Sequence, residues 1–137
     1  MKTTARNELK GIVNEIIEGI VMAEVRVEVS PSIFISATIT KEGFKNMGIS
    51  LGDEVYVLIK ASSMILSKRR MRATARNILK GKIEKIIKGA VNSEVKLSIG
   101  ENLLCAVVTN EAIEELQLKE QEDIYAVFKA SSVILVA

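Results

Sequence analysis

The sequence predicts a mainly β protein made of two OB-like β-barrel modules in tandem, each with about five strands and one short helix. The first observation behind this prediction is an internal repeat. Residues 4–11 (TARNELKG) return 70 positions later as residues 74–81 (TARNILKG), and residues 60–66 (KASSMIL) return 69 positions later as residues 129–135 (KASSVIL). The repeat divides the chain into a first module, residues 1–67, a basic linker, residues 68–72, and a second module, residues 73–137.

The second observation is a hydrophobic period of two, which is typical of strands with one buried face. Val25, Val27 and Val29 alternate with charged residues, and residues 33–39 continue the pattern. A further strand is expected over residues 54–60. Several short strands of this kind within so small a module are typical of the oligonucleotide-binding (OB) barrel.

A short helix is expected where the period of two is lost. Residues 41–47 suit one or two helical turns that end at Gly48, and the second module repeats this helix at residues 111–116, behind the capping residues Thr109 and Asn110. A module of this size is at the lower limit for independent folding, because small domains bury little surface. We therefore expect the two modules to pack together and the chain to oligomerise.

The composition excludes several familiar chemistries. The chain has no His, so it has no His general base, no Ser-His-Asp triad and no His-ligated metal. Its single cysteine, Cys105, excludes an intramolecular disulfide and a Cys-based zinc site, and the apolar run at residues 103–108 predicts a buried strand. With 2 Tyr, 3 Phe and no Trp, the core is expected to consist mainly of Ile, Val, Leu and Ala.

The positive charge is local to the linker. The first module has 7 basic and 8 acidic residues and the second has 8 and 9, whereas the linker adds four positive charges and brings the total to +2. The net charge therefore does not indicate a basic nucleic-acid-binding face. Charges interrupt every hydrophobic run well before about 18 residues, and the first residues lack the apolar stretch of a signal peptide, so we expect a cytoplasmic protein.

Polar side chains that match in both modules are the candidate binding residues, because other surface charges have changed freely, as from Glu15 to Lys85. The matched pairs are Thr4/Thr74, Arg6/Arg76, Asn7/Asn77, Lys60/Lys129 and Ser62/Ser131. All are hydrogen-bond donors, and the two clusters of matched polar residues contain no carboxylate, which suits a fully deprotonated oxyanion. Backbone N–H groups of the two motifs would add donors, and one Arg with one Lys balances a dianion.

Structural roles are the alternative for several of these residues. A Thr or Asn near a strand start is commonly a turn or cap residue, and Thr40 and Thr109 suit helix N-caps. Neither module has a Gly-rich phosphate loop, so the matched glycines are expected to lie at bulges or turns. These glycines are Gly11/Gly81 and Gly19/Gly89.

The two motifs, each present twice and in the same order, resemble the molybdenum-pterin-binding (Mop) domain. This is a TOBE-type module of molbindins and of molybdate-responsive regulators and transporter subunits. The resemblance covers nearly the whole chain, which looks like a tandem two-module molbindin. It implies a small OB-type barrel without enzymatic activity that binds molybdate or tungstate in the cytoplasm, with the metal present only as the oxyanion. It also implies molybdenum storage, buffering or homeostasis and, for a tandem member, a homotrimer.

Carried over to this sequence, the resemblance implies one main oxyanion site in each module. The first would comprise Thr4, Ala5, Arg6, Asn7, Thr40, Lys60, Ala61 and Ser62, and the second Thr74, Ala75, Arg76, Asn77, Thr109, Lys129, Ala130 and Ser131. Thr stands where the family usually has Ser at the start of the first motif, and it keeps the hydroxyl donor. A further site near the symmetry axis would use the turns formed by Gly19, Ile20, Val21, Gly89, Ala90 and Val91.

Two other functions stay open. One is oligonucleotide binding, because the barrel type supports it and the linker is basic, although five aromatic residues make a poor platform for stacking bases. The other is oxyanion sensing, in which occupancy changes contacts with a partner through the linker and the partner in turn changes the oxyanion affinity. We expect no membrane partner.

Overall fold

A computed structural model describes residues 3–137 and confirms a mainly β fold of two OB-like modules. The first module contains β1 (Asn7–Glu18), β2 (Met22–Ser30), β3 (Ile33–Thr40), α1 (Lys41–Met47), β4 (Glu54–Ile59), the 3-10 turn η1 (Ala61–Ser63) and β5 (Ile65–Ser67). The second contains β6 (Asn77–Ile87), β7 (Asn92–Ile99), β8 (Asn102–Thr109), α2 (Asn110–Leu116), β9 (Asp123–Phe128), η2 (Ala130–Ser132) and β10 (Ile134–Val136). Each module thus has the predicted five strands and one short helix.

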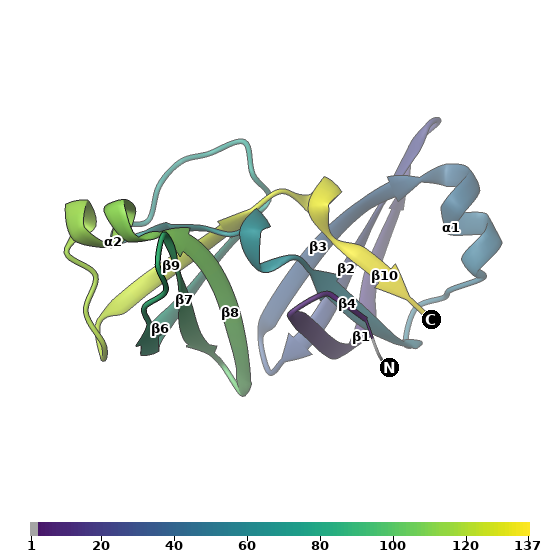
Figure 1. Ribbon diagram of the computed structural model, residues 1–137. Helices are drawn as coiled ribbons and strands as arrows, with labels where there is room; N and C mark the ends of the chain where they lie inside the picture. Colours follow the sequence, from purple (N-terminus) through teal and green to yellow (C-terminus); the bar gives the residue numbers. More distant parts are fainter. Residues whose placement is uncertain (1–2) are drawn as a thin grey trace.

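The two modules exchange their last strands. The sheets have the orders β10-β4-β1-β2-β3 and β5-β9-β6-β7-β8. Ile134 of β10 pairs with Leu58 of β4, and Ile65 of β5 pairs with Val127 of β9. Figure 1 shows β10, in yellow, beside β4 in the sheet of the first module. Each sheet therefore takes four strands from one copy of the repeat and the fifth from the other copy.

Helix α1 begins and ends where the local sequence predicts, whereas α2 begins one residue earlier than predicted, at Asn110, which was predicted as a cap. The Thr40 hydroxyl accepts a hydrogen bond from the N–H of Gly43, and Gly48 ends α1 in the left-handed conformation, with φ of 63°. The Thr109 hydroxyl caps α2 in the same way through the N–H of Ala112. The capping role weighed for these two threonines is thus present in the structure.

One hydrophobic core runs through both modules. It is built mainly from Val, Ile, Leu and Ala, as the composition predicts, and Phe128 is the aromatic residue fully buried in it. The alternating residues Val25 and Val27 of β2 are buried, and so are Val95 and Leu97 at the equivalent positions of β7. Because the buried side chains form a single cluster, the expectation that the modules pack together is confirmed.

Gly11 lies at a close approach between strands rather than in a turn. Strand β1 pairs with β4 over its first half and with β2 over its second half, and Gly11 lies near this change of partner. A Cβ atom there would come within 2.7 Å of the carbonyl oxygen of Glu28. Gly81 repeats the arrangement against the carbonyl oxygen of Ser98, at 2.5 Å. The β-bulges lie further along both strands, so the predicted bulge or turn role of these glycines is wrong.

Candidate oxyanion-binding site

Pairing of the first and fourth strands brings the two motifs of each module together. Asn7, the first residue of β1, pairs with Ile59, the last residue of β4, so Arg6 and Lys60 directly adjoin the same end of this strand pair. In the second module Asn77 pairs with Phe128, and Arg76 and Lys129 adjoin the end of β6 and β9 in the same way. Segments far apart in the sequence therefore meet twice, each time with one Arg and one Lys.

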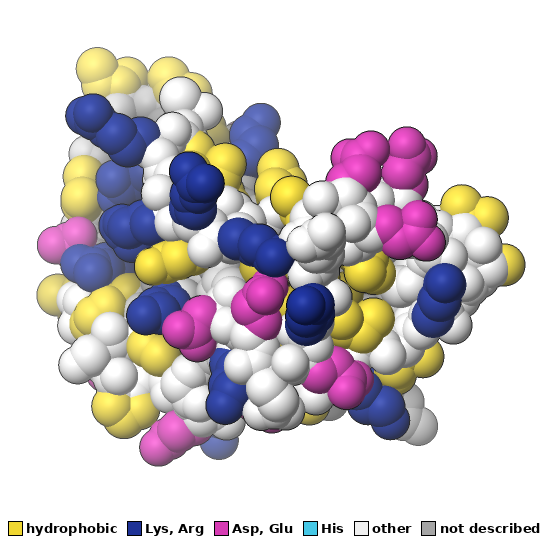
Figure 2. Space-filling view, turned by 90° about the vertical axis from the view of Figure 1, so that its left-hand side faces the viewer, with side chains coloured by type: hydrophobic (Ala, Val, Ile, Leu, Met, Phe, Trp, Pro, Cys, Tyr) yellow, Lys and Arg dark blue, Asp and Glu magenta, His cyan; other side chains and the backbone are white. Residues whose placement is uncertain are grey.

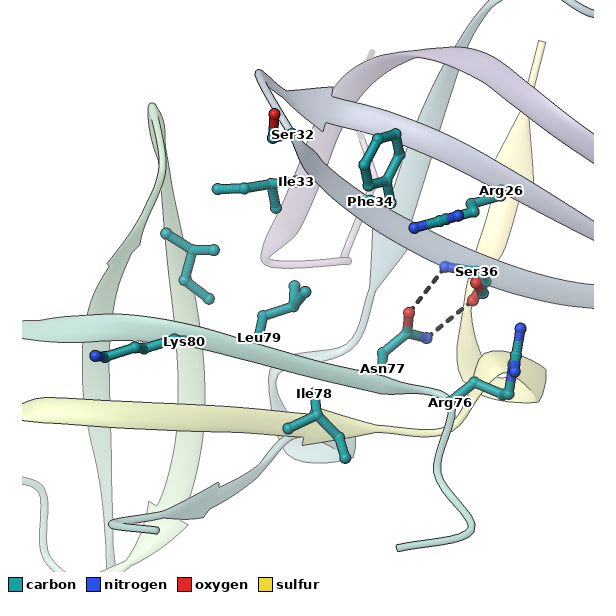
Figure 3. A pocket seen from close by; sticks show the side chains of 11 residues that line it. Arg26, Ser32, Ile33, Phe34, Ser36, Arg76, Asn77, Ile78, Leu79 and Lys80 are labelled. Atoms are coloured by element: carbon teal, nitrogen blue, oxygen red, sulfur yellow. Dashed lines mark hydrogen bonds between the residues drawn. The ribbon is translucent and has the colours of Figure 1, made fainter. Parts of the chain in front are cut away.

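The asparagines of the first motif connect the two modules. The Asn7 side chain donates to the carbonyls of Ile59 (3.1 Å) and Cys105 (2.8 Å) and accepts from the N–H of Cys105 (2.6 Å). The Asn77 side chain accepts from the N–H of Ser36 (2.8 Å) and donates to its carbonyl (2.9 Å), as the dashed lines in Figure 3 show. Both asparagines are buried. Their amides thus bond to protein backbone, whereas the sequence predicted that they would donate to an oxyanion.

Each asparagine completes the edge of a sheet. Ser36 lies in β3 and Cys105 in β8, and these are the outermost strands of their sheets. An edge strand carries backbone groups that need partners, and a side-chain amide offers the same donor and acceptor as another strand would. The 3-10 turns η2 and η1 contact β3 and β8 as well. Both motifs of one module therefore pack against the edge strand of the other.

A carboxylate from the opposite module binds each arginine. Arg76 donates from Nε to Oε1 of Glu24 (2.8 Å) and from Nη2 to Oε2 (2.9 Å), a bidentate pair. Arg6 donates from Nη1 to Glu94. The hydrogen bond from Arg6 lowers the pKa of the Glu94 carboxyl below its ordinary value, and the same bond raises the pKa of Arg6. The expectation of clusters without a carboxylate is therefore wrong for the folded chain.

The sequence did contain a signal for these glutamates. Glu24 and Glu94 occupy equivalent positions of the repeat, related by the same shift that relates Arg6 to Arg76. Each glutamate alternates with buried residues along its strand, which is the pattern of an ordinary solvent-facing position. Its arginine partner is visible only once the two modules are packed together.

The remaining side-chain donors of the motifs face solvent. The exposed ones are Thr4, Lys60, Ser62, Thr74, Lys129 and Ser131. Ala61 and Ala130 are buried and begin the two 3-10 turns, whose first N–H groups lack partners within the turn. Ala5 is partly buried, as is its counterpart Ala75, and the N–H of Ala5 donates to the Thr3 hydroxyl. Within one chain the two candidate sites are thus open to solvent on one side.

The structure groups Thr40 and Thr109 differently from the prediction. Strand β3, which ends at Thr40, accepts the Asn77 amide and contacts η2. Strand β8, which ends at Thr109, accepts the Asn7 amide and contacts η1. Each threonine therefore ends the strand that contacts the motifs of the other module, so any site that included it would combine residues of both modules.

A cavity of about 540 Å³ extends from Arg76 between the modules. Its wall carries two more cations, Arg26 and Lys80, and the Arg26 guanidinium carbon lies 4.2 Å from the centre of the Phe34 ring. Figure 3 shows Arg26 of β2 and Phe34 of β3 on the side of the pocket that faces Asn77, with Lys80 further along β6. The sequence did not predict Arg26, Phe34 and Lys80 as lining residues. Lys96 replaces Arg26 at the equivalent position of the other module, so the surroundings of the two arginine sites differ.

The turns predicted to form an axial site are exposed hairpin tips. Ile20 is 94% exposed, and Val21 and Val91 are each 70% exposed. The N–H of Gly19 already donates to the carbonyl of Met22, and the carbonyl of Gly89 accepts from the Asn110 side chain. These tips therefore present an apolar surface in both modules.

The described residues contain neither a metal-binding cluster nor a membrane-spanning helix. Within residues 3–137, no group of three or more His, Cys, Asp or Glu side chains could hold a metal ion. None of the helices in this part of the chain has the length and apolar character needed to cross a membrane.

Comparison with known proteins identifies the repeated module. The TOBE domain matches residues 3–66 and 73–135. The molybdenum transport protein ModE of Azotobacter vinelandii is 41% identical over 98% of this chain and 51% of its own length. The molybdenum-pterin-binding protein MopA of Rhodobacter capsulatus is 36% identical over 98% of this chain and 52% of its own length. This chain therefore spans about half the length of both relatives.

A solved structure agrees over the full length. The cytoplasmic molybdate-binding protein ModG, in a crystal form with molybdate bound, matches with a TM-score of 0.94 and 38% identity, covering 100% of this chain and 99% of ModG. Together with the two domain matches, this similarity confirms the resemblance to tandem Mop proteins and the fold class predicted from the repeat. The chain belongs to the TOBE-domain family and carries two copies of the domain in tandem.

Proposed function

We propose that this protein binds molybdate or tungstate as the oxyanion and serves in storage, buffering or homeostasis of intracellular molybdenum. The observation that carries the proposal is the strand pairing that brings together the two donor-rich motifs of each module, one with Arg6 or Arg76 and the other with Lys60 or Lys129. Similarity over the whole chain to ModG, a cytoplasmic molybdate-binding protein, supports the same ligand and compartment. The role is binding rather than catalysis.

The donor chemistry fits a tetrahedral dianion. In the first module Arg6 and Lys60 supply two positive charges, Thr4 and Ser62 supply hydroxyls, and the start of η1 supplies the N–H of Ala61. Arginine presents its N–H groups in a planar fork that can bind two oxygens of one anion, and charge-assisted hydrogen bonds are the strong ones. We assign the same roles in the second module to Thr74, Arg76, Lys129, Ala130 and Ser131, and we give Asn7 and Asn77 a structural role.

A complete site requires a second copy of the chain in this proposal. The charged and hydroxyl donors of both motifs are exposed, whereas a tightly held oxyanion needs shielding from water. The exposed apolar tips at Ile20, Val21 and Val91 offer surface for self-association. We therefore propose a homotrimer in which neighbouring chains cover the open sides of the sites, and we place the secondary oxyanion sites near these tips.

Native mass spectrometry tests the proposal directly. The purified protein is incubated separately with molybdate, tungstate, sulfate and phosphate at equal concentration, and the mass of the intact assembly gives both copy number and bound anions. We expect a trimer that takes up several molybdates or tungstates and little sulfate. Equal uptake of all four anions, or uptake of none, would contradict the proposed function.

Oligonucleotide binding is the less favoured alternative. Stacking of bases needs exposed aromatic rings, but Phe128 is buried in the core and Phe34 lies against Arg26. On the face shown in Figure 2, basic side chains are interspersed with apolar and acidic ones.

The sensing alternative is supported by the exposed linker, although Lys68 in it contacts the carbonyl of Gln117 and the carboxylate of Glu122. A partner that changes the molybdate affinity would favour sensing.

A further inference from the structure

We propose that Glu24 and Glu94 are internal competitors of the oxyanion, which occupy Arg76 and Arg6 in the empty protein and are displaced when the anion binds. The inference rests on the proposed function, because it concerns the same two arginines. It assigns a role in setting affinity to two residues outside the binding motifs.

The carboxylate of Glu24 occupies the N–H groups with which Arg76 would bind an oxyanion. Glu24 meets the guanidinium with two parallel hydrogen bonds, 2.8 and 2.9 Å long. This is the arrangement in which an arginine holds two oxygens of an oxyanion. The carboxylate and the proposed ligand therefore need the same N–H groups, and both cannot hold them in this way at once.

The net charge of the site also favours displacement of the glutamate. In the first module Arg6 and Lys60 contribute two positive charges, and Glu94 removes one of them while it stays on Arg6. A dianion added to that arrangement would leave a net negative site and a direct repulsion between anion and carboxylate. Displacement of Glu94 removes this repulsion and restores a balanced site.

The competing glutamate is present at both sites because the two modules have it at equivalent positions. Both glutamates come from the module opposite the arginine, and both are kept at equivalent positions of the two modules. Other charged positions differ between the modules: Glu15 of the first module corresponds to Lys85 of the second. The same competition is thus built into both sites. It also means that anion binding releases an ion pair between the modules.

The test replaces both glutamates by the isosteric amide. The double variant Glu24→Gln with Glu94→Gln keeps the side-chain shape and removes the competing charge. We expect isothermal titration with molybdate at neutral pH to show about twofold to fivefold tighter binding per site, the range that corresponds to the free energy of exposed ion pairs. A gain in affinity is diagnostic, because a merely structural defect would weaken binding.

Two further variants separate contact from charge. Glu42→Gln with Glu111→Gln makes the same change in net charge at matched, exposed helix positions, and we expect its affinity to equal that of the parent. Glu24→Asp with Glu94→Asp keeps the charge on a shorter side chain, and we expect an affinity between those of the parent and the amide variant. Unchanged or weaker binding by the amide variant, with binding by the parent, overturns the competition and leaves the proposed function intact.

Failure of the proposed function gives a different result. If neither the parent nor the amide variant takes up molybdate or tungstate, the proposed function and the competition are both wrong. If the amide variant binds and the parent does not, the competition is supported in a stronger form. The oligomeric state of each variant is measured alongside, so that a loss of assembly is not mistaken for a loss of affinity.

Discussion

Asn7 and Cys105, far apart in the sequence, are joined by reciprocal hydrogen bonds between the Asn7 side-chain amide and the Cys105 backbone. The amide takes the place that a neighbouring strand would have beside β8. Asn77 does the same for Ser36 of β3. A residue predicted from the first motif as an oxyanion donor thus connects the two modules, next in sequence to the arginine that meets a glutamate of the opposite module.

Removal of the Asn7 amide should destabilise the whole chain. Asn7→Ala would leave the N–H and carbonyl of Cys105 buried without their partner, which costs about 1–3 kcal/mol per orphaned group. We expect a loss of roughly 3 kcal/mol in the free energy of unfolding, measured by urea titration. The exposed Asn92→Ala is the control and should change stability little. A loss no larger than that of the control would show that the backbone finds other partners.

Removal of both arginines should abolish the main sites without unfolding the protein. Arg6 and Arg76 are exposed, and their ion pairs contribute little to stability. We expect Arg6→Ala with Arg76→Ala to keep the oligomer and to lose molybdate uptake in isothermal titration. Arg69→Ala with Arg70→Ala, in the exposed linker, removes the same charge and should bind as the parent does. Equal binding by both double variants would place the oxyanion elsewhere.

Acid should cancel the contribution of Glu94 to stability. The hydrogen bond from Arg6 holds the pKa of Glu94 below its ordinary value, and Lys96 acts in the same direction. The contribution is therefore present above the ordinary pKa of a glutamate and is lost as the pH falls through the lowered value. We expect the difference in unfolding free energy between the parent and Glu94→Gln, measured from pH 7 down to pH 3, to vanish at the acid end. A difference independent of pH would mean that the ion pair does not carry it.

The thiol of Cys105 should react slowly in the native protein. Burial raises the pKa of Cys105, so a smaller fraction is thiolate at a given pH than for a free cysteine. We expect a disulfide reagent such as Ellman's reagent to label the native protein much more slowly than the protein unfolded in urea. Equal rates would indicate that β8 opens readily.

Local patterns predicted the elements that depend on local chemistry. Thr40 and Gly48 bound the first helix because one can cap it and the other adopts the left-handed conformation that ends it. The alternation of Val25 and Val27 with charged residues likewise predicted the buried face of β2, because successive side chains of a strand point to opposite faces of the sheet.

The exchange of strands could not be predicted in this way. Ile65 and Ile134 belong to copies of the same motif, so either residue suits either sheet, and the choice depends on how the modules pack. The glutamates next to Arg6 and Arg76 are another case, because each pairing joins distant parts of the sequence that belong to different modules. The sequence therefore predicted the two motifs of each candidate site but not the carboxylates that bind their arginines.

Because the modules exchange strands, the linker also makes their association intramolecular. A single module with this topology lacks one sheet strand and can complete its sheet only by borrowing β5 or β10 from another module. Fusion of two modules in one chain turns that bimolecular association into an intramolecular one, at an effective concentration of about a millimolar or more. The stability of the paired modules then no longer depends on protein concentration. In this sense the chain is a covalent dimer, and each half acts as the folding partner of the other.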